Sequence, residues 1–77
     1  MEIQYTKQSV KFLQKQPVYI QRRIVKAIER LPLGDVKKMQ GEPFYRLRIG
    51  DVRVIFEREQ SCIIVKRIAS RGEIYKA

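Results

Sequence analysis

The sequence predicts an α+β fold in which two helices pack on one face of a small, mainly antiparallel sheet. Two segments between residues 7 and 31 repeat apolar side chains at helical spacing. A short alternating segment precedes these helices, and three strand-like segments joined by short turns follow them. Because consecutive strands joined by short turns usually pair, we expect a meander and the element order strand-helix-helix-strand-strand-strand.

The first half of the chain supplies one strand and the helical pair. Residues 2–5 alternate apolar and polar side chains, which predicts a strand. Thr6 is typical of the N-cap of a helix, here over residues 7–16. Pro17 suits the first position of a second helix over residues 17–31, and the tight connection predicts antiparallel packing. The apolar stripe of this second helix consists of Ile20, Ile24, Ala27, Ile28 and Leu31.

The second half supplies the other strands. Residues 34–43 read as a polar connector that contains Lys37 and Lys38. The strands that follow it are predicted at residues 44–49, 52–58 and 62–70. No internal repeat or linker interrupts the 77 residues, so we expect a single domain over residues 1–77.

The net charge indicates the class of partner. Seventeen Lys and Arg residues against eight Asp and Glu residues give a formal net charge of +9. Such a balance favours polyanionic partners, which are nucleic acids or acidic proteins. Solubility is the plainer interpretation of the charge, although a net charge of about 2 to 8 is enough for that purpose.

The residues that are absent limit the chemistry. The chain has no histidine and one cysteine. Zinc sites with the usual ligand sets and Ser-His or Cys-His nucleophile pairs are therefore excluded, and we expect neither a metal nor a cofactor. Cys62 begins an apolar strand and is interpreted as a small core residue.

Apolar runs indicate the compartment. The longest one, "CIIV", is too short to cross a membrane, and the N-terminal residues lack the apolar core of a signal peptide. A single cysteine forms no internal disulfide, which suits a reducing environment. We therefore expect a cytoplasmic protein with no membrane partner.

The register of one hairpin follows from its turn. Gly50 and Asp51 form a two-residue turn, and glycine in the first position suits type II′. With this turn, three apolar pairs share one face: Ile49 with Val52, Leu47 with Val54, and Tyr45 with Phe56. We expect the helices to cover that face.

The opposite face of the same hairpin gathers arginines. It receives the pairs Arg48 with Arg53, Arg46 with Ile55, and Phe44 with Glu57. Directly opposed like charges destabilise a strand pair by part of the roughly 0.2–1 kcal/mol that cross-strand pairs contribute. We interpret this uncovered face as a phosphate cradle, because a guanidinium group forms two parallel bonds to phosphate. A solvated face, with the arginines splayed and Glu57 neutralising one of them, is the alternative.

Further cations extend this surface toward the C-terminus. Tyr75 lies among them, and an aromatic ring beside cations is typical of binding to single-stranded RNA. Tyr75 could equally pack to fix the C-terminus. The expected RNA-binding residues are Lys37, Lys38, Lys66, Arg67 and Lys76. The helix charges that form an outer surface, or add a secondary basic flank, are Arg22, Arg23, Lys26 and Arg30.

Three segments follow the predicted helices: "GDVKKMQG", "YRLRIGDVRVIFE" and "IASRGEIYK". With them, the chain resembles the RelE/ParE superfamily of bacterial and archaeal toxins. The resemblance covers nearly the whole chain. The RelE branch, which the sequence favours, implies an endoribonuclease that cuts messenger RNA in the ribosomal A site and is restrained by an antitoxin. The ParE branch implies inhibition of DNA gyrase and generally lacks the catalytic set. The resemblance implies catalytic roles for Arg46, Arg48, Arg53, Arg71 and Tyr75.

The chain departs from the superfamily pattern in its proton acceptors. Arg46 and Arg48 stand where lysines are frequent, and arginine stays protonated, so both can stabilise charge but accept protons poorly. Ser70 stands where many relatives carry histidine. The candidates for the base are Glu57 and Tyr75, and Glu57 could instead serve as a spacer between the arginines.

Our hypothesis for the mechanism is that the 2′-hydroxyl of the RNA attacks the adjacent phosphate in line. Arg53 and Arg71 would hold that phosphate, Arg46 and Arg48 would bind flanking charge, and Tyr75 would stack on a base or relay a proton. The expected partners are mRNA on the ribosome and an acidic antitoxin with a helical segment, with operator DNA bound only through the antitoxin complex. A gyrase inhibitor without nuclease activity and an attenuated RNA- or protein-binding module remain the alternatives.

Overall fold

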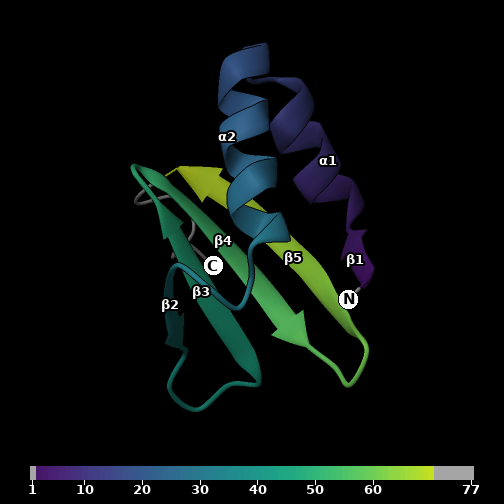
Figure 1. Cartoon of the computed structure of the whole chain (residues 1–77), viewed down its shortest axis with the longest axis vertical. Coiled ribbons are helices and arrows are strands. Elements are labelled where there is room, and N and C mark those ends of the chain that lie inside the picture. The colour runs from purple at the N-terminus through teal and green to yellow at the C-terminus, as the bar shows by residue number, and fades with distance from the viewer. Residues whose placement is uncertain (1, 71–77) are drawn as a thin grey trace.

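The computed structural model describes residues 2–70, which form a five-stranded sheet with two helices against one face (Figure 1). The elements are β1 (Glu2–Tyr5), α1 (Lys7–Gln14), α2 (Val18–Glu29), β2 (Asp35–Lys38), β3 (Phe44–Ile49), β4 (Val52–Arg58) and β5 (Cys62–Ser70). The strand order is β1-β5-β4-β3-β2, with β1 parallel to β5 and the other neighbours antiparallel. The predicted α+β class is confirmed. Within residues 2–70, no helix is long and apolar enough to cross a membrane.

The sheet contains one strand more than the sequence predicts. Asp35–Lys38, expected as part of a connector, forms β2 and pairs antiparallel with β3. Only Val36 of this strand is partly buried, so β2 shows no alternating apolar pattern. Its stability comes from pairing with β3 at the sheet edge, a tertiary interaction that local sequence does not encode.

Side-chain hydrogen bonds fix the start of α1 to β5. Thr6 caps the helix as predicted, accepting a bond from the backbone N–H of Ser9 at 3.4 Å. The fully buried Ser9 donates its Oγ to the carbonyl of Val65 at 3.2 Å. Gln8 bonds the backbone N–H and carbonyl of Ile68 at 3.1 and 3.0 Å. These bonds join segments about sixty residues apart in the sequence. Helix α2 begins one residue later than predicted, with Pro17 as its N-cap and Val18 as its first helical residue.

The main core lies between the helices and the sheet. Tyr45 stacks on Phe56 there, with ring centroids 5.5 Å apart. Full burial of one large apolar side chain contributes about 1.5–3 kcal/mol, so this core determines which sheet face the helices cover. The buried members of the core are Ile24, Ile28, Leu31, Leu47, Val54, Phe56, Ile63, Val65 and Ile68.

The β3–β4 hairpin has the predicted register. Ile49 pairs with Val52, and the six Cα pairs continue from there to Phe44 with Glu57. Gly50 has φ +56°, and no residue other than glycine has a positive φ within residues 2–70. A type I′ turn needs positive φ at both central residues, so these values fit type II′.

A β-bulge interrupts the pairing of β4 with β5. Ile55 pairs with Arg67 and Phe56 pairs with Val65, so Lys66 is an extra residue. Bulges re-aim side chains, and here Lys66 reaches Glu57, on the face away from the helices.

Candidate nucleic-acid interface

The sheet face away from the helices carries most of the predicted site residues. We call it the cationic face. Strand alternation and the pairing register place on it the side chains of Lys37, Arg46, Arg48, Arg53, Glu57, Lys66 and Arg67. Of the four other predicted residues, Lys38 lies at the end of β2, and Arg71, Tyr75 and Lys76 lie outside the described part of the chain.

The centre of the cationic face is apolar. Ile55 and Ala69 are buried there and form a second small cluster with the partly buried Met39 and Phe44. Arg46 on β3 and Arg67 on β5 both pair with Ile55, one from each side. The face therefore combines a central apolar floor with guanidinium groups around it.

Arg48 is exposed between one acidic and one basic neighbour. Its Cα partners are Arg53 on β4 and Asp35 on β2. Asp35 was not among the predicted site residues, because its placement depends on the unpredicted strand β2. Its carboxylate side chain shares the face with Arg48, where opposite charges on neighbouring strands favour pairing.

Arg53 is buried, which corrects the expectation that all three hairpin arginines lie on an uncovered face. Only 5% of Arg53 is exposed. Its Nη1 donates to the carbonyl of Gly50 at 2.7 Å and to that of Val52 at 3.2 Å. These bonds turn the guanidinium toward the hairpin turn and satisfy part of its charge locally. A guanidinium group has five N–H donors, so the bonds made by Nη1 leave others for an anion.

Glu57 forms an ion pair with Lys66, with 3.7 Å between Oε2 and Nζ. Both side chains are partly exposed, at 30% and 40%, so the pair contributes little to stability. Glu57 lies four residues along β4 from Arg53, which corresponds to about 13 Å. Its carboxylate therefore sits at the flank of the cationic face.

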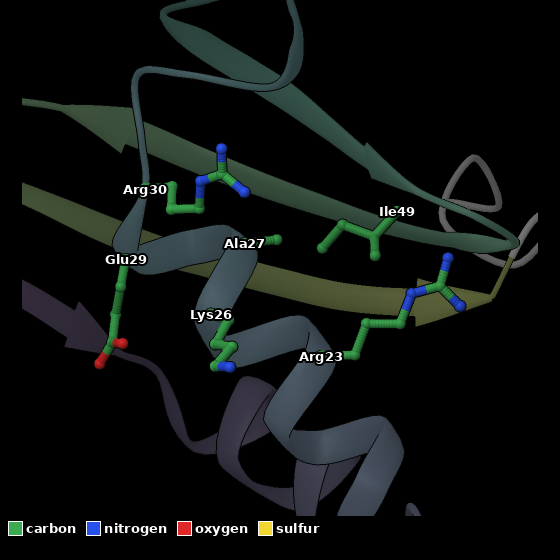
Figure 2. Close-up of a pocket in the computed structure, with 6 residues that line it drawn as sticks. All are labelled: Arg23, Lys26, Ala27, Glu29, Arg30 and Ile49. Atoms are coloured by element: carbon green, nitrogen blue, oxygen red, sulfur yellow. The ribbon is translucent and has the colours of Figure 1, made fainter.

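A second basic surface lies on the helix side. It is an open depression of about 600 Å³ lined by Arg23, Lys26, Ala27, Glu29, Arg30 and Ile49. Figure 2 shows the guanidinium groups of Arg23 and Arg30 on either side of Ile49, whereas Lys26 and Glu29 point away from it. The guanidinium of Arg23 approaches Gly50, where a Cβ atom would lie 3.4 Å from Nη2. The helix-side depression and the cationic face therefore meet at the hairpin turn.

Alternation along β2 gives Lys38 the parity of the helix-covered face. Lys38 pairs with Tyr45, whose ring belongs to the helix-covered face. Lys38 is the exposed last residue of β2, and it nevertheless lines a depression together with Lys37 and Arg46.

The thiol and the first tyrosine belong to the core rather than to a reactive site. Cys62 is buried as predicted, and burial raises the pKa of its thiol, with a further contribution from Glu59. Burial also raises the pKa of Tyr5, with Glu29 adding to the shift. A protonated buried thiol is a poor nucleophile. Within residues 2–70, no group of three or more His, Cys, Asp or Glu side chains could hold a metal ion.

Comparison with known families identifies the class of protein. The family model described as the ParE toxin of the type II toxin–antitoxin system parDE matches residues 3–75. This chain belongs to that toxin family. Toxin RelE3 of Methanocaldococcus jannaschii is 32% identical to it, over 97% of this chain and 96% of the relative. The protein is thus a RelE-like toxin of a type II toxin–antitoxin system.

Solved structures of similar proteins share the fold of this toxin. The RelB–RelE antitoxin–toxin complex from Methanococcus jannaschii matches with a TM-score of 0.75 and 33% identity, over 94% of each chain. YafQ from E. coli strain BL21(DE3) matches with a TM-score of 0.70 over 97% of this toxin and 98% of that chain. YafQ is only 16% identical, so this second likeness supports the fold alone.

Three features of the toxin site were not predicted from the sequence. Asp35 beside Arg48 and the bulge at Lys66 both depend on strand pairing across the sheet. The apolar centre around Ile55 was missed for a different reason. The parity of β4 places Ile55 opposite Arg46, and an isoleucine among the cations was a sign of a second apolar cluster on that face.

Proposed function

We propose that this toxin is a ribosome-dependent endoribonuclease that cleaves mRNA and thereby stops translation. The supporting observation is the gathering of cations from adjacent strands on one sheet face. Lys37 on β2 lies directly opposite Arg46 on β3. Arg48, also on β3, lies directly opposite Arg53 on β4. Opposed cations on neighbouring strands repel each other, and a phosphate backbone between them removes that repulsion.

In the proposed reaction, the 2′-oxygen of the RNA attacks the adjacent phosphorus and the bond to the 5′-oxygen breaks. The 2′-hydroxyl loses a proton to a base, the leaving 5′-oxygen gains one, and a 2′,3′-cyclic phosphate remains. Arg53 is held by the turn carbonyls, so its remaining donors are oriented before substrate binds. The exposed Arg48 and its strand neighbour Arg46 supply positive charge to the developing dianion and to flanking phosphates.

The position of Glu57 bears on which group accepts the proton. Glu57 lies about 13 Å along β4 from Arg53 and is paired with Lys66. A phosphate held at Arg53 is therefore beyond its direct reach, and Glu57 fits better as a flanking charge. This favours Tyr75, the other candidate, as the proton relay, while Arg71 would hold the scissile phosphate as the resemblance implies.

Two arginine variants test the proposal. We expect Arg48→Ala and Arg53→Ala each to reduce cleavage of ribosome-bound mRNA by about 100-fold, as loss of one transition-state donor does. The measurement is primer extension on a defined message in a purified translation mixture. Arg58→Ala is the matched control, because Arg58 is an exposed arginine of the same strand on the opposite parity. Undiminished cleavage by both test variants would refute the assignment.

We also propose that an acidic antitoxin covers the cationic face. Similar toxins were solved as a RelB–RelE complex and as the RelBE2 toxin–antitoxin complex of Mycobacterium tuberculosis. The exposed cations explain why masking by an acidic helical segment would be favourable. Co-expression with a small acidic protein encoded beside the toxin gene should yield a complex that dissociates as salt rises. Operator DNA would bind only to that complex.

Inhibition of DNA gyrase is the second candidate, because the matching family model is described as that of ParE toxins. Induction of the toxin in growing cells separates the two. Endoribonuclease action predicts that protein synthesis stops before DNA synthesis and that new mRNA ends appear. Gyrase inhibition predicts the reverse order and no new mRNA ends.

A further inference from the structure

A depression of about 270 Å³ lies at the edge of the cationic face. It is lined by Lys37, Lys38, Met39, Gln40 and Arg46. These residues come from the end of β2, the loop after it and β3. Arg46 belongs both to this depression and to the row of arginines on β3, where it lies two residues, or about 7 Å, from Arg48.

The chemistry of the lining fits one nucleotide of single-stranded RNA. Lys37 and Arg46 are directly opposed cations that a phosphate would bridge. Met39 is a partly buried thioether that continues the apolar cluster on this face, and such sulfur atoms contact aromatic rings favourably. The guanidinium plane of an arginine is also a stacking partner for bases. Gln40 is exposed and adds an amide, which can donate to and accept from the edge of a base.

The loop that carries Met39 and Gln40 is fixed by backbone bonds. The N–H of Met39 donates to the carbonyl of Phe44 at 2.9 Å, and the N–H of Glu42 donates to the carbonyl of Met39 at 3.3 Å. Gly41 follows with φ +75°, a conformation that glycine adopts without strain. The amide of Gln40 is therefore presented from a closed hairpin loop rather than from a long connector.

We propose that this depression binds a nucleobase of the substrate RNA beside the phosphate that is cleaved, and that Gln40 and Met39 set the base preference of cleavage. The inference rests on the proposed function. It assigns the flanking cations Lys37 and Arg46 to the phosphate of that same nucleotide and the amide of Gln40 to the edge of its base.

The test is the base profile of cleavage on ribosome-bound messages with a randomised segment. We expect Gln40→Ala to reduce cleavage mainly at the preferred base. We expect the ratio of the best to the worst base at one position beside the cut to fall about tenfold, equivalent to about 1.4 kcal/mol. Gln60→Ala is the matched control, because Gln60 is an exposed glutamine between β4 and β5. It should leave the profile unchanged.

Met39→Leu provides a second variant that preserves apolar volume. It removes the sulfur contact and should lower the preference at the same position as Gln40→Ala. A profile identical to that of the unmodified toxin in both variants overturns the inference while leaving the nuclease assignment intact. The inference is also overturned if Gln40→Ala weakens antitoxin binding without changing the base profile, since the depression then belongs to a protein interface. The nuclease assignment is unaffected by that result. Absence of cleavage by the unmodified toxin refutes the proposed function instead.

Discussion

Replacement of Arg53 should affect folding stability as well as activity, whereas replacement of its neighbour Arg48 should affect activity alone. Arg53 is 5% exposed and its Nη1 forms bonds of 2.7 and 3.2 Å with two carbonyls. A hydrogen bond from a charged donor contributes about 1.5–3 kcal/mol. Because one nitrogen makes both bonds and Gly50 is exposed to water, we count them as about 2 kcal/mol rather than twice that value.

Relief of charge repulsion works against this loss. Arg53→Ala removes the like-charge pairing with Arg48, which returns less than about 1 kcal/mol. The net destabilisation is therefore about 1–2 kcal/mol. In a domain of this size, that lowers the Tm by about 4–16 °C. Arg48→Ala removes the same repulsion and also the favourable cross-strand pairing with Asp35, so the two effects offset each other at this exposed position and stability should change by at most about 0.5 kcal/mol.

The assay is thermal unfolding of the purified toxin followed by circular dichroism, with both variants and Arg58→Ala measured in the same buffer. The two test variants should share the loss of cleavage and differ in Tm. If Arg53→Ala unfolds at the temperature of Arg48→Ala, the buried bonds to the turn contribute nothing. The account of Arg53 as a pre-oriented donor is then wrong.

The remaining predictions concern the turn, the buried hydroxyl, the thiol and the RNA contacts. Gly50→Ala should destabilise the toxin by about 1–3 kcal/mol in urea unfolding, because φ is +56° there; an unchanged midpoint would contradict the turn geometry. Ser9→Ala removes one of the two donors to the carbonyl of Val65, which keeps the N–H of Thr6, and should lower the free energy of unfolding by about 0.5–1.5 kcal/mol, with the m-value unchanged. The pKa of Cys62 is raised above its ordinary 9.0, so the folded state binds the thiol proton more tightly than the unfolded state. Its contribution to stability should therefore be complete below about pH 9 and decline above it. Unfolding of Cys62→Ala should show a smaller alkaline decline, because Tyr5, whose pKa is also raised from its ordinary 10.0, still loses its contribution at higher pH. Arg48→Ala should reduce the slope of log K against log salt for single-stranded RNA by about 0.7, and an unchanged slope would exclude a phosphate contact.

The register of the β3–β4 hairpin could be predicted from the sequence because two independent patterns agree there. A glycine-first turn and strict alternation of apolar residues from Tyr45 to Phe56 define one register. The identity of the covered face follows, since only one face is apolar enough to pack against helices.

Other parts depend on interactions that no local pattern contains. The strand Asp35–Lys38 has only one partly buried residue. It therefore lacks the alternation of apolar and polar side chains by which a strand is recognised, and its pairing with β3 could not be predicted. Parity correctly assigned Arg53 to a face but not its burial, because the direction of a long side chain depends on which carbonyls lie within reach. The bulge at Lys66 likewise becomes apparent only when β4 and β5 are aligned.

The central place of β5 has a consequence for synthesis of the toxin. This strand lies between β1 and β4, and it supplies the carbonyl groups that bond Gln8 and Ser9 at the start of α1. A growing polypeptide can complete neither the sheet nor the anchoring of its first helix until residues 62–70 have left the ribosomal tunnel. Prematurely terminated products should therefore stay unstructured and harmless to the cell that makes them. A fragment ending before Cys62 that folded cooperatively would show that this dependence on the last described strand does not exist.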